Sequence, residues 1–401
     1  MTRKKHSKKK TSRKVGNSSK TITEEITKTK KTVTKKNLHL EAMRGILALM
    51  VLVSHVELIR LYFGHSDDYL NPIIYHLGRV AVTGFFVLSG YLITMSILRR
   101  IETNRWSVGD FYIGRIFRIW PLYFFVIILA IWVLPHVSIL EFNVPDFLID
   151  ARENSDNYWY FLFFLPQIPL IHNNILPFAE PTWSIGVEEI FYIIIPWVFV
   201  FLKKRFIKGV FIFFIIFLIA KYIAIYGYEL PVGNRWALYI NFYRYDCIAL
   251  GCLMGAMHFK KSTLFEKVNR WHLLLALASF ALLFLIIDVE SYDYFPFALC
   301  FGVMIAYLVN KNSTLRSPKW LVYVGTISYS LYLTHEIAIV FFINLGIDGK
   351  SMVAMYALSI LGAILLASGI YYLIEKPFMD FGNNKLRNHK VVAVPKEQSV
   401  Q

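Results

Sequence analysis

Two histidines and a glutamate lie inside stretches of this sequence that are otherwise strongly apolar. His55 stands in MVLVSHVELI, Glu188 in WSIGVEEIFY and His335 in ISYSLYLTHEIAI. A neutral imidazole can serve as a general base or a nucleophile, and a carboxylate can orient it and stabilise its protonated form. Ionisable groups within lipid-spanning stretches usually mark a functional site. We therefore predict that His55, Glu188 and His335 are catalytic; a structural hydrogen bond between helices is the alternative role for His55.

Arg44 precedes His55 by eleven residues. Eleven helical steps of 100° amount to three turns and about 20°, so both side chains leave one face, and they lie about 16 Å apart along the axis. Arg115 and Arg118 share a helix face at i, i+3 spacing. Because the guanidinium fork suits phosphate, we predict that these three arginines bind phosphate groups at the inner membrane surface. The alternative is that they are positively charged anchors.

Three further residues are predicted to bind substrate. Arg244 and Asp246 lie in NFYRYDCIALG, and Trp183 opens the stretch that contains Glu188. Counted from the ends of their apolar stretches at 1.5 Å per residue, five ionisable residues share one depth in the outer half of the membrane: His55, Glu188, Arg244, Asp246 and His335. This agreement among four separate stretches predicts one site.

The composition places these residues in a membrane protein. Apolar residues make up 56% and charged residues 17% of the 401 residues, and the mean hydropathy is +0.48. Soluble domains are about half apolar and a quarter charged. The composition excludes a disordered chain, a collagen or a coiled coil and argues against a cytosolic enzyme. The three cysteines lack both the even number of a disulfide framework and metal-ligand spacing, so we expect no metal.

Ten apolar stretches are long enough to cross a hydrocarbon core of about 30 Å. They are residues 38–63, 72–98, 116–134, 183–202, 207–227, 237–258, 271–287, 293–310, 320–345 and 353–374. Loops rich in Lys and Arg alternate with loops that are not, and such a bias marks the cytoplasmic side. We predict an all-α integral membrane protein with about ten transmembrane helices and both termini in the cytoplasm. Segment 158–170 is too short to span and is expected to be interfacial or re-entrant.

The charge is concentrated at the N-terminus. Residues 1–36 contain fourteen Lys/Arg and two Glu, which gives +12 of the formal net charge of +16. With little to bury, they are predicted to be a disordered basic cytoplasmic tail that is attracted to anionic lipid headgroups. Nucleic acid is not expected, because no aromatic residues interleave the lysines. The predicted organisation is this tail, a membrane domain at 37–380 and a cytoplasmic C-terminal tail at 381–401.

Seven motifs, in order, make about residues 37–380 resemble acyltransferase family 3, the integral-membrane O-acyltransferases that modify cell-surface polysaccharides. The first is an arginine followed, after ten residues, by a histidine, here Arg44 and His55. The others are similar to the family's FFxxSG, RxxR, WSLSVEEQFY, RFDALLLG, SYSLYLWHxP and IEKP elements, and read here FFVLSG, RIFR, WSIGVEEIFY, YRYDCIALG, SYSLYLTHE and LIEKPF. Thr334 stands where the family often has Trp, and Ile337 where it often has Pro.

This resemblance implies a donor, an acceptor and a division of roles. The donor would be cytoplasmic acyl-coenzyme A, most simply acetyl-coenzyme A, with its phosphates on Arg44, Arg115 and Arg118. The acceptor would be a hydroxyl of a surface polysaccharide or lipid-linked glycan outside a bacterial cytoplasmic membrane. His55 would act as base or nucleophile and Glu188 would orient it. His335 and Arg244 would be further candidates for the acceptor or oxyanion site.

Other functions are compatible with the same residues. A secondary transporter or flippase of a glycan or small molecule also has ionisable residues near the midplane, although this sequence shows no repeated half. A membrane scaffold would leave the shared depth of His55, Glu188 and His335 unexplained. The acceptor, the acyl group, direct transfer against an acyl-histidine relay, and the oligomeric state stay open.

Overall fold

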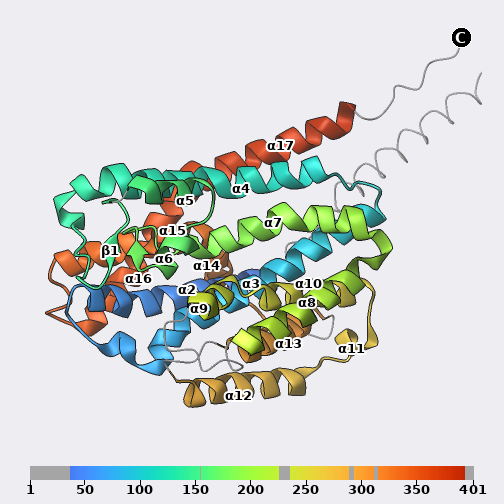
Figure 1. The fold of residues 1–401 in the computed structure, drawn as a ribbon, viewed down its shortest axis with the longest axis horizontal. Helices are drawn as coiled ribbons and strands as arrows, with labels where there is room; N and C mark the ends of the chain where they lie inside the picture. The colour runs from blue at the N-terminus through green and yellow to red at the C-terminus, as the bar shows by residue number, and fades with distance from the viewer. Residues whose placement is uncertain (1–36, 154, 225–234, 289–292, 311–314, 393–401) are drawn as a thin grey trace, which may run out of the picture. The chain divides into compact units, whose positions relative to one another are not determined.

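The computed structural model describes residues 37–153, 155–224, 235–288, 293–310 and 315–392. The contacts given below lie within the unit His39–Gln401. The predicted tail 1–36 and the end of the predicted C-terminal tail, 393–401, lie outside the described residues. The described chain is almost entirely helical (Figure 1), as the predicted all-α class requires.

Helices of eight residues or more contain most of the described residues. They are α2 (Leu38–Tyr62), α3 (Pro72–Glu102), α4 (Val108–Ile128), α7 (Thr182–Leu202), α8 (Phe206–Tyr222), α9 (Arg235–Tyr243), α10 (Tyr245–Phe259), α12 (Arg270–Ile286), α13 (Phe295–Val309), α14 (Lys319–Thr326), α15 (Ser328–Asn344), α16 (Met352–Ile370) and α17 (Lys376–Val392). The short helices are α5 (Tyr158–Leu162), α6 (Gln167–Ile171) and α11 (Thr263–Glu266). Two-residue strands β1 (Ile149–Asp150) and β2 (Asn174–Ile175) pair in parallel, with Ile149 opposite Asn174 and Asp150 opposite Ile175.

Several helices begin directly after a residue whose side chain accepts a hydrogen bond from the first turn. Asn71 accepts a hydrogen bond from the backbone of Ile73, with Pro72 in the first helical position of α3. Ser107 and Ser351 cap α4 and α16 in the same way. Such side chains satisfy backbone N–H groups that have no partner within the helix.

The close packing of α3 against α10 depends on two glycines. A Cβ atom at Gly90 would run into the carbonyl oxygen of Ile248, and one at Gly251 would run into that of Val87. Small residues let helix backbones approach in this way in membrane proteins. The contact fixes α3, which contributes to every cavity described below.

Two helix breaks occur next to predicted site residues. The pair α14 and α15 is bent by 82° just before the stretch that carries His335. Between α9 and α10, Arg244 adopts a left-handed backbone with φ of 40°, a conformation that is uncommon for residues other than glycine.

Five helical stretches within the described residues are long and apolar enough to cross a membrane, or six if the bent pair α14–α15 forms one span. They are Leu38–Tyr62, Pro72–Glu102, Val108–His136, Thr182–Leu202 and Met352–Arg387. The protein is thus a multi-pass membrane protein. Each of the ten predicted stretches contains a helix, but the number of spans stays a prediction. The predicted interfacial segment 158–170 forms the two short helices α5 and α6.

Candidate functional site

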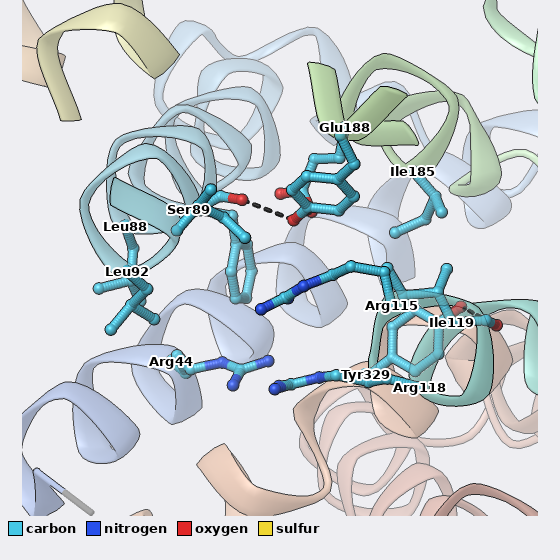
Figure 2. Close-up of a pocket in the computed structure, with 13 residues that line it drawn as sticks. Arg44, Leu88, Ser89, Leu92, Arg115, Arg118, Ile119, Ile185, Glu188 and Tyr329 are labelled. Carbon is cyan, nitrogen blue, oxygen red and sulfur yellow. Dashed lines mark hydrogen bonds between the residues drawn. The ribbon is translucent and has the colours of Figure 1, made fainter. Parts of the chain in front are cut away.

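Three arginines from two helices converge on one pocket (Figure 2). Arg44 comes from α2, and Arg115 and Arg118 come from α4 with the i, i+3 spacing that places them on one face. Figure 2 shows all three side chains extending into the same space. The lining of this arginine pocket consists of Arg44, Phe85, Leu88, Ser89, Leu92, Ile93, Arg115, Arg118, Ile119, Ile185, Glu188, Tyr192 and Tyr329. The predicted phosphate-binding residues therefore share one site.

Glu188 lies in this arginine pocket, whereas we expected it to pair with His55. Its Oε2 accepts a hydrogen bond of 2.5 Å from the hydroxyl of Tyr192, which is also 2.6 Å from Oγ of Ser89. Arg115 lies over the ring of Tyr192, 5.4 Å from its centroid. The carboxylate that lies beside His55 is Glu336 instead.

Glu188 does not lie beside His55, as the predicted shared depth would have it, because α7 begins next to the cavity that His55 lines. The segment before α7 folds into the protein, where Phe178 and Ala179 are buried. Glu180 lines the same cavity as His55, so the chain is already at the level of His55 there. Eight residues further, about 12 Å along a helix, Glu188 reaches the level of the arginines.

His55 and His335 form a hydrogen-bonded pair between α2 and α15. Nδ1 of His55 lies 3.0 Å from Nε2 of His335, and Nδ1 of His335 lies 3.2 Å from the carbonyl oxygen of Leu331. Oε1 of Glu336 is buried, makes no hydrogen bond within the described residues, and lies 3.4 Å from Nδ1 of His55. The structure thus joins both predicted histidines and adds a carboxylate.

These contacts determine the tautomer of both rings. A carbonyl oxygen can only accept, so Nδ1 of His335 carries the proton and its Nε2 carries a lone pair. Nδ1–H of His55 must then donate to His335, because a neutral imidazole has one donor and one acceptor nitrogen. Nε2 of His55 is consequently left with a lone pair, which is the requirement for a general base.

The same side chains also have the composition of a metal site. Ligand atoms of His55, His335 and Glu336 lie within 4.8 Å of one another, the one such group among the described residues. Two histidines and a glutamate suit zinc. The hydrogen bond between the two rings uses the nitrogens that a metal would need, so the base and metal arrangements exclude each other.

His55 opens into a second cavity, which we call the outer cavity. Its polar lining comes from Ser54, His55, Tyr62, Tyr69, Tyr75, Arg79, Asn173, Glu180, Asn241, Arg244 and Tyr332, and its aromatic and aliphatic lining includes Trp183, Phe242, Leu148, Leu170, Ile171 and Ile175. Part of the lining comes from residues in or next to β1, α6 and β2. A carboxylate, arginines and aromatic rings around one space are the groups that bind a polar, ring-shaped ligand.

Glu180 is the carboxylate of the outer cavity, and sequence reasoning missed it. It accepts a 3.1 Å hydrogen bond from the hydroxyl of Tyr62. Burial, and to a lesser degree the Glu336 carboxylate, raise the pKa of Glu180, which lies before α7 begins. Its position three residues before Trp183, at the end of the loop between α4 and α7, was the one available signal.

Arg244 and Trp183, both predicted to bind substrate, lie together in the outer cavity. The guanidinium of Arg244 lies 5.7 Å from the centroid of the Trp183 ring. It donates to the carbonyl of Asn241 at 2.8 Å, to that of Arg79 at 2.6 Å and to Oγ1 of Thr83 at 3.0 Å. These bonds hold the side chain in one orientation.

Asp246 has a partner that the sequence did not predict. Its Oδ2 lies 2.7 Å from Nζ of Lys221 on α8, and Asp293 binds the same ammonium at 2.8 Å. Lys221 and Asp246 are 2% and 0% exposed, and Asp246 is not among the residues that line the outer cavity. Asp246 therefore belongs to a buried ion pair outside the lining of this cavity, and its substrate contact stays a prediction.

A third hollow, which we call the connecting hollow, lies between the two sites. It shares Arg44, Phe85, Ile185, Glu188 and Tyr329 with the arginine pocket. It extends past Ser184 to Tyr332, which also lines the outer cavity. The three hollows thus form a series from the arginines to His55, with α2, α3, α7 and α15 contributing to both ends.

Comparison with known proteins identifies the family. A family model described as an acyltransferase domain, Acyl_transf_3, matches residues 37–372. The chain belongs to acyltransferase family 3. The resemblance predicted from the seven motifs is thereby confirmed.

Two curated relatives of this acyltransferase 3 chain come from Staphylococcus aureus. The O-acetyltransferase OatA of Staphylococcus aureus (strain NCTC 8325 / PS 47) is 28% identical over 346 residues. A protein of strain COL, provisionally named O-acetyltransferase SACOL0978, is 30% identical over 349 residues. Each alignment covers 78% of this chain and 56% of the relative, so the chain spans little more than half the length of these relatives. No solved structure matches the chain.

Proposed function

We propose that this protein is a membrane O-acetyltransferase, which moves an acetyl group from acetyl-coenzyme A to a hydroxyl of a cell-surface glycan. The observation that carries this proposal is the series of hollows from the arginine pocket to Nε2 of His55. Family membership and the O-acetyltransferase names of the relatives support the reaction class.

The donor binds with its phosphates on Arg44, Arg115 and Arg118. Arginine forks make charge-assisted, often bidentate, hydrogen bonds to phosphate. Glu188 belongs to this donor side, where its negative charge offsets part of the charge of the three guanidinium groups. From there the arm that carries the thioester follows the connecting hollow to His55, a distance of about 16 Å along α2.

His55 acts as the general base in direct transfer. Its Nε2 takes the proton of the acceptor hydroxyl as the oxygen attacks the thioester carbonyl carbon. The resulting tetrahedral intermediate collapses, the carbon–sulfur bond breaks, and the leaving thiolate of coenzyme A takes the proton from His55. The products are an acetyl ester and free coenzyme A, and the enzyme returns to its starting state.

His335 and Glu336 support the charge that forms on His55. During the transfer His55 becomes an imidazolium, whose Nδ1–H is held by His335 at 3.0 Å and faces Glu336 at 3.4 Å. A carboxylate in this position stabilises the protonated ring, as in hydrolase triads. Glu336 therefore takes the role that sequence reasoning gave to Glu188.

The acceptor occupies the outer cavity. Glu180 accepts hydrogen bonds from sugar hydroxyls, and Trp183, fixed against Arg244, supplies an aromatic face for the sugar ring. Charged and hydroxyl-bearing groups in such a cavity set ligand orientation. A polysaccharide and a lipid-linked glycan would place the same kind of sugar in the cavity and would differ in the portion of the acceptor that lies outside it.

This division of sites is consistent with a ten-span topology, with both termini in the cytoplasm of a bacterial cell. The arginine pocket would then face the cytoplasmic donor and the outer cavity the extracytoplasmic acceptor. The basic tail 1–36 would lie against anionic lipid headgroups. Cysteine-accessibility labelling of intact cells tests the arrangement, because residues in loop 135–181 should react and residues in loop 260–269 should not.

Purified protein in liposomes, supplied with acetyl-coenzyme A labelled in the acetyl group and a soluble oligosaccharide, tests the function directly. We expect labelled ester on the oligosaccharide and release of coenzyme A in equal amounts. Movement of the oligosaccharide across the liposome membrane without labelling would contradict the proposal and favour a transporter or flippase.

A further inference from the structure

One tyrosine stands where the donor side meets the acceptor side. Tyr332 lines both the connecting hollow and the outer cavity. We propose that Tyr332, held by Ser184, is the positioning residue that admits a short acyl group to His55 and excludes water until the acceptor arrives. This inference rests on the proposed acetyl transfer.

The hydroxyl of Tyr332 bridges two helices across the connecting hollow. It lies 2.8 Å from Oγ of Ser184, so that α15 and α7 are joined at this point. Oγ of Ser184 lies 3.3 Å from the carbonyl oxygen of Pro181, to which it can only donate. Tyr332 is therefore the donor to Ser184, and both side chains are buried.

The ring of Tyr332 narrows the connecting hollow where it approaches His335. It lies edge-on to Phe85, with ring centroids 6.0 Å apart, and 6.3 Å from the ring of His335. The space between the arginine pocket and His55 is thus bounded by two aromatic rings. Because one methylene too many in a fitted pocket changes discrimination about 10–200-fold, this pair of rings favours acetyl over longer acyl groups.

The hydroxyl and the ring have separable consequences. Without the hydroxyl, water reaches the thioester when no acceptor is bound. His55 then takes a proton from water as the water oxygen bonds to the carbonyl carbon. The carbon–sulfur bond breaks and the leaving thiolate takes the proton from His55. Acetic acid, which ionises to acetate in solution, and coenzyme A leave. Without the ring, longer acyl groups pass as well.

Three variants separate these effects. Tyr332→Phe and Ser184→Ala should raise acceptor-independent hydrolysis of acetyl-coenzyme A by about 10-fold and keep the preference for acetyl over butyryl. Tyr332→Ala should lower the ratio of acetyl to butyryl transfer by about 10-fold or more. The matched control is Tyr323→Phe, which removes a similar tyrosine–serine bond, 2.7 Å to Ser368. Tyr323 is exposed and lines none of the three hollows. Tyr323→Phe should leave both the acceptor-independent hydrolysis and the ratio of acetyl to butyryl transfer unchanged.

Each outcome bears on one hypothesis. Coenzyme A binding and thermal unfolding of every variant show whether it is folded, and ratios within one variant do not depend on its active fraction. A wild-type protein that transfers acetyl, together with a Tyr332→Ala variant that keeps the wild-type chain-length ratio, would overturn the role of Tyr332 alone. A wild-type protein that transfers nothing would overturn the proposed function, and the affinities of Tyr332→Ala for acetyl- and butyryl-coenzyme A would then still test the filter.

Discussion

Nε2 of His335 lies 3.0 Å from Nδ1 of His55, although 280 residues separate the two in the chain. The contact joins α2, at the beginning of the membrane domain, to α15 near its end. It also sets which nitrogen of His55 is free to take a proton. The proposed base thus depends on two helices that must both be in place.

Replacing His55 should abolish acetyl transfer and leave donor binding nearly intact. Arg44, the proposed phosphate-binding residue, lies about 16 Å away along α2, whereas loss of a general base costs on the order of 10²–10⁴ in rate. His55→Gln keeps hydrogen-bonding capacity but not basicity. Transfer rates and coenzyme A affinity of His55→Ala and His55→Gln decide the matter; an active Gln variant would make His55 a structural contact.

Replacing the partners of His55 should have graded effects. His335→Leu removes the acceptor that holds Nδ1–H, so we expect a loss of about 10-fold or more in kcat, while His335→Gln retains an amide oxygen and should lose less. Glu336→Gln should lower kcat because the imidazolium loses its counter-charge. Glu188→Gln is the contrasting variant, since it should change donor binding more than kcat. If Glu188→Gln lowered kcat and Glu336→Gln did not, the result would favour the sequence-predicted pairing of His55 with Glu188.

Removing one arginine should weaken donor binding. Arg115→Ala or Arg118→Ala should cost roughly 1.5–3 kcal/mol of coenzyme A binding if a hydrogen bond to a charged group is lost. Lysine should rescue only in part, because it replaces a planar fork by a point charge. Isothermal titration with coenzyme A measures this, and unchanged affinity with poorer membrane insertion would show that the arginines are anchors.

Glu180→Gln should raise KM for the acceptor and leave donor affinity unchanged. The substitution should also make stability depend less on pH. Burial raises the pKa of Glu180 above its ordinary value near 4.5, so the folded protein keeps a proton that the unfolded chain releases. Wild-type stability therefore falls as pH rises above that ordinary value, and Glu180→Gln should gain in Tm over wild type between about pH 5 and about pH 8. A constant Tm difference would contradict the shift.

Zinc should inhibit the enzyme, and chelators should not. In the base arrangement the hydrogen bond between His55 and His335 occupies the nitrogens that a metal would bind, yet the three ligand atoms lie within 4.8 Å of one another. Added zinc would capture them and remove the base. Loss of transfer on treatment with a chelator, with recovery on adding zinc, would replace the base mechanism by a metal-assisted one.

The sequence predicted contacts along single helices better than contacts between them. The shared face of Arg115 and Arg118 and the convergence of these residues with Arg44 follow from helical spacing and loop charge. The level of Glu188 was misjudged because depth was counted from the start of α7, and a loop that folds inward cannot be recognised from hydropathy. Lys221 and Asp246 pair only because α8 packs on α10, which no local pattern specifies.

The contact of Glu336 with His55 is another contact between helices that the sequence did not predict. It follows His335 directly, and neighbouring residues on a helix point about 100° apart. Spacing alone therefore places it on a different face from its neighbour. Only the position of α2 brings His55 within 3.4 Å of the Glu336 carboxylate.

The inward-folded segment before α7 separates the reaction from the choice of acceptor. His55, His335 and the arginines stand on long helices, whereas the wall of the outer cavity near Leu148, Asn173 and Glu180 comes from the loop between α4 and α7. Under the proposed function, substitutions or insertions in that loop would change which sugar is modified while the proton-transfer machinery stays as it is. One catalytic framework would in this way diversify toward new glycans through a single exchangeable segment.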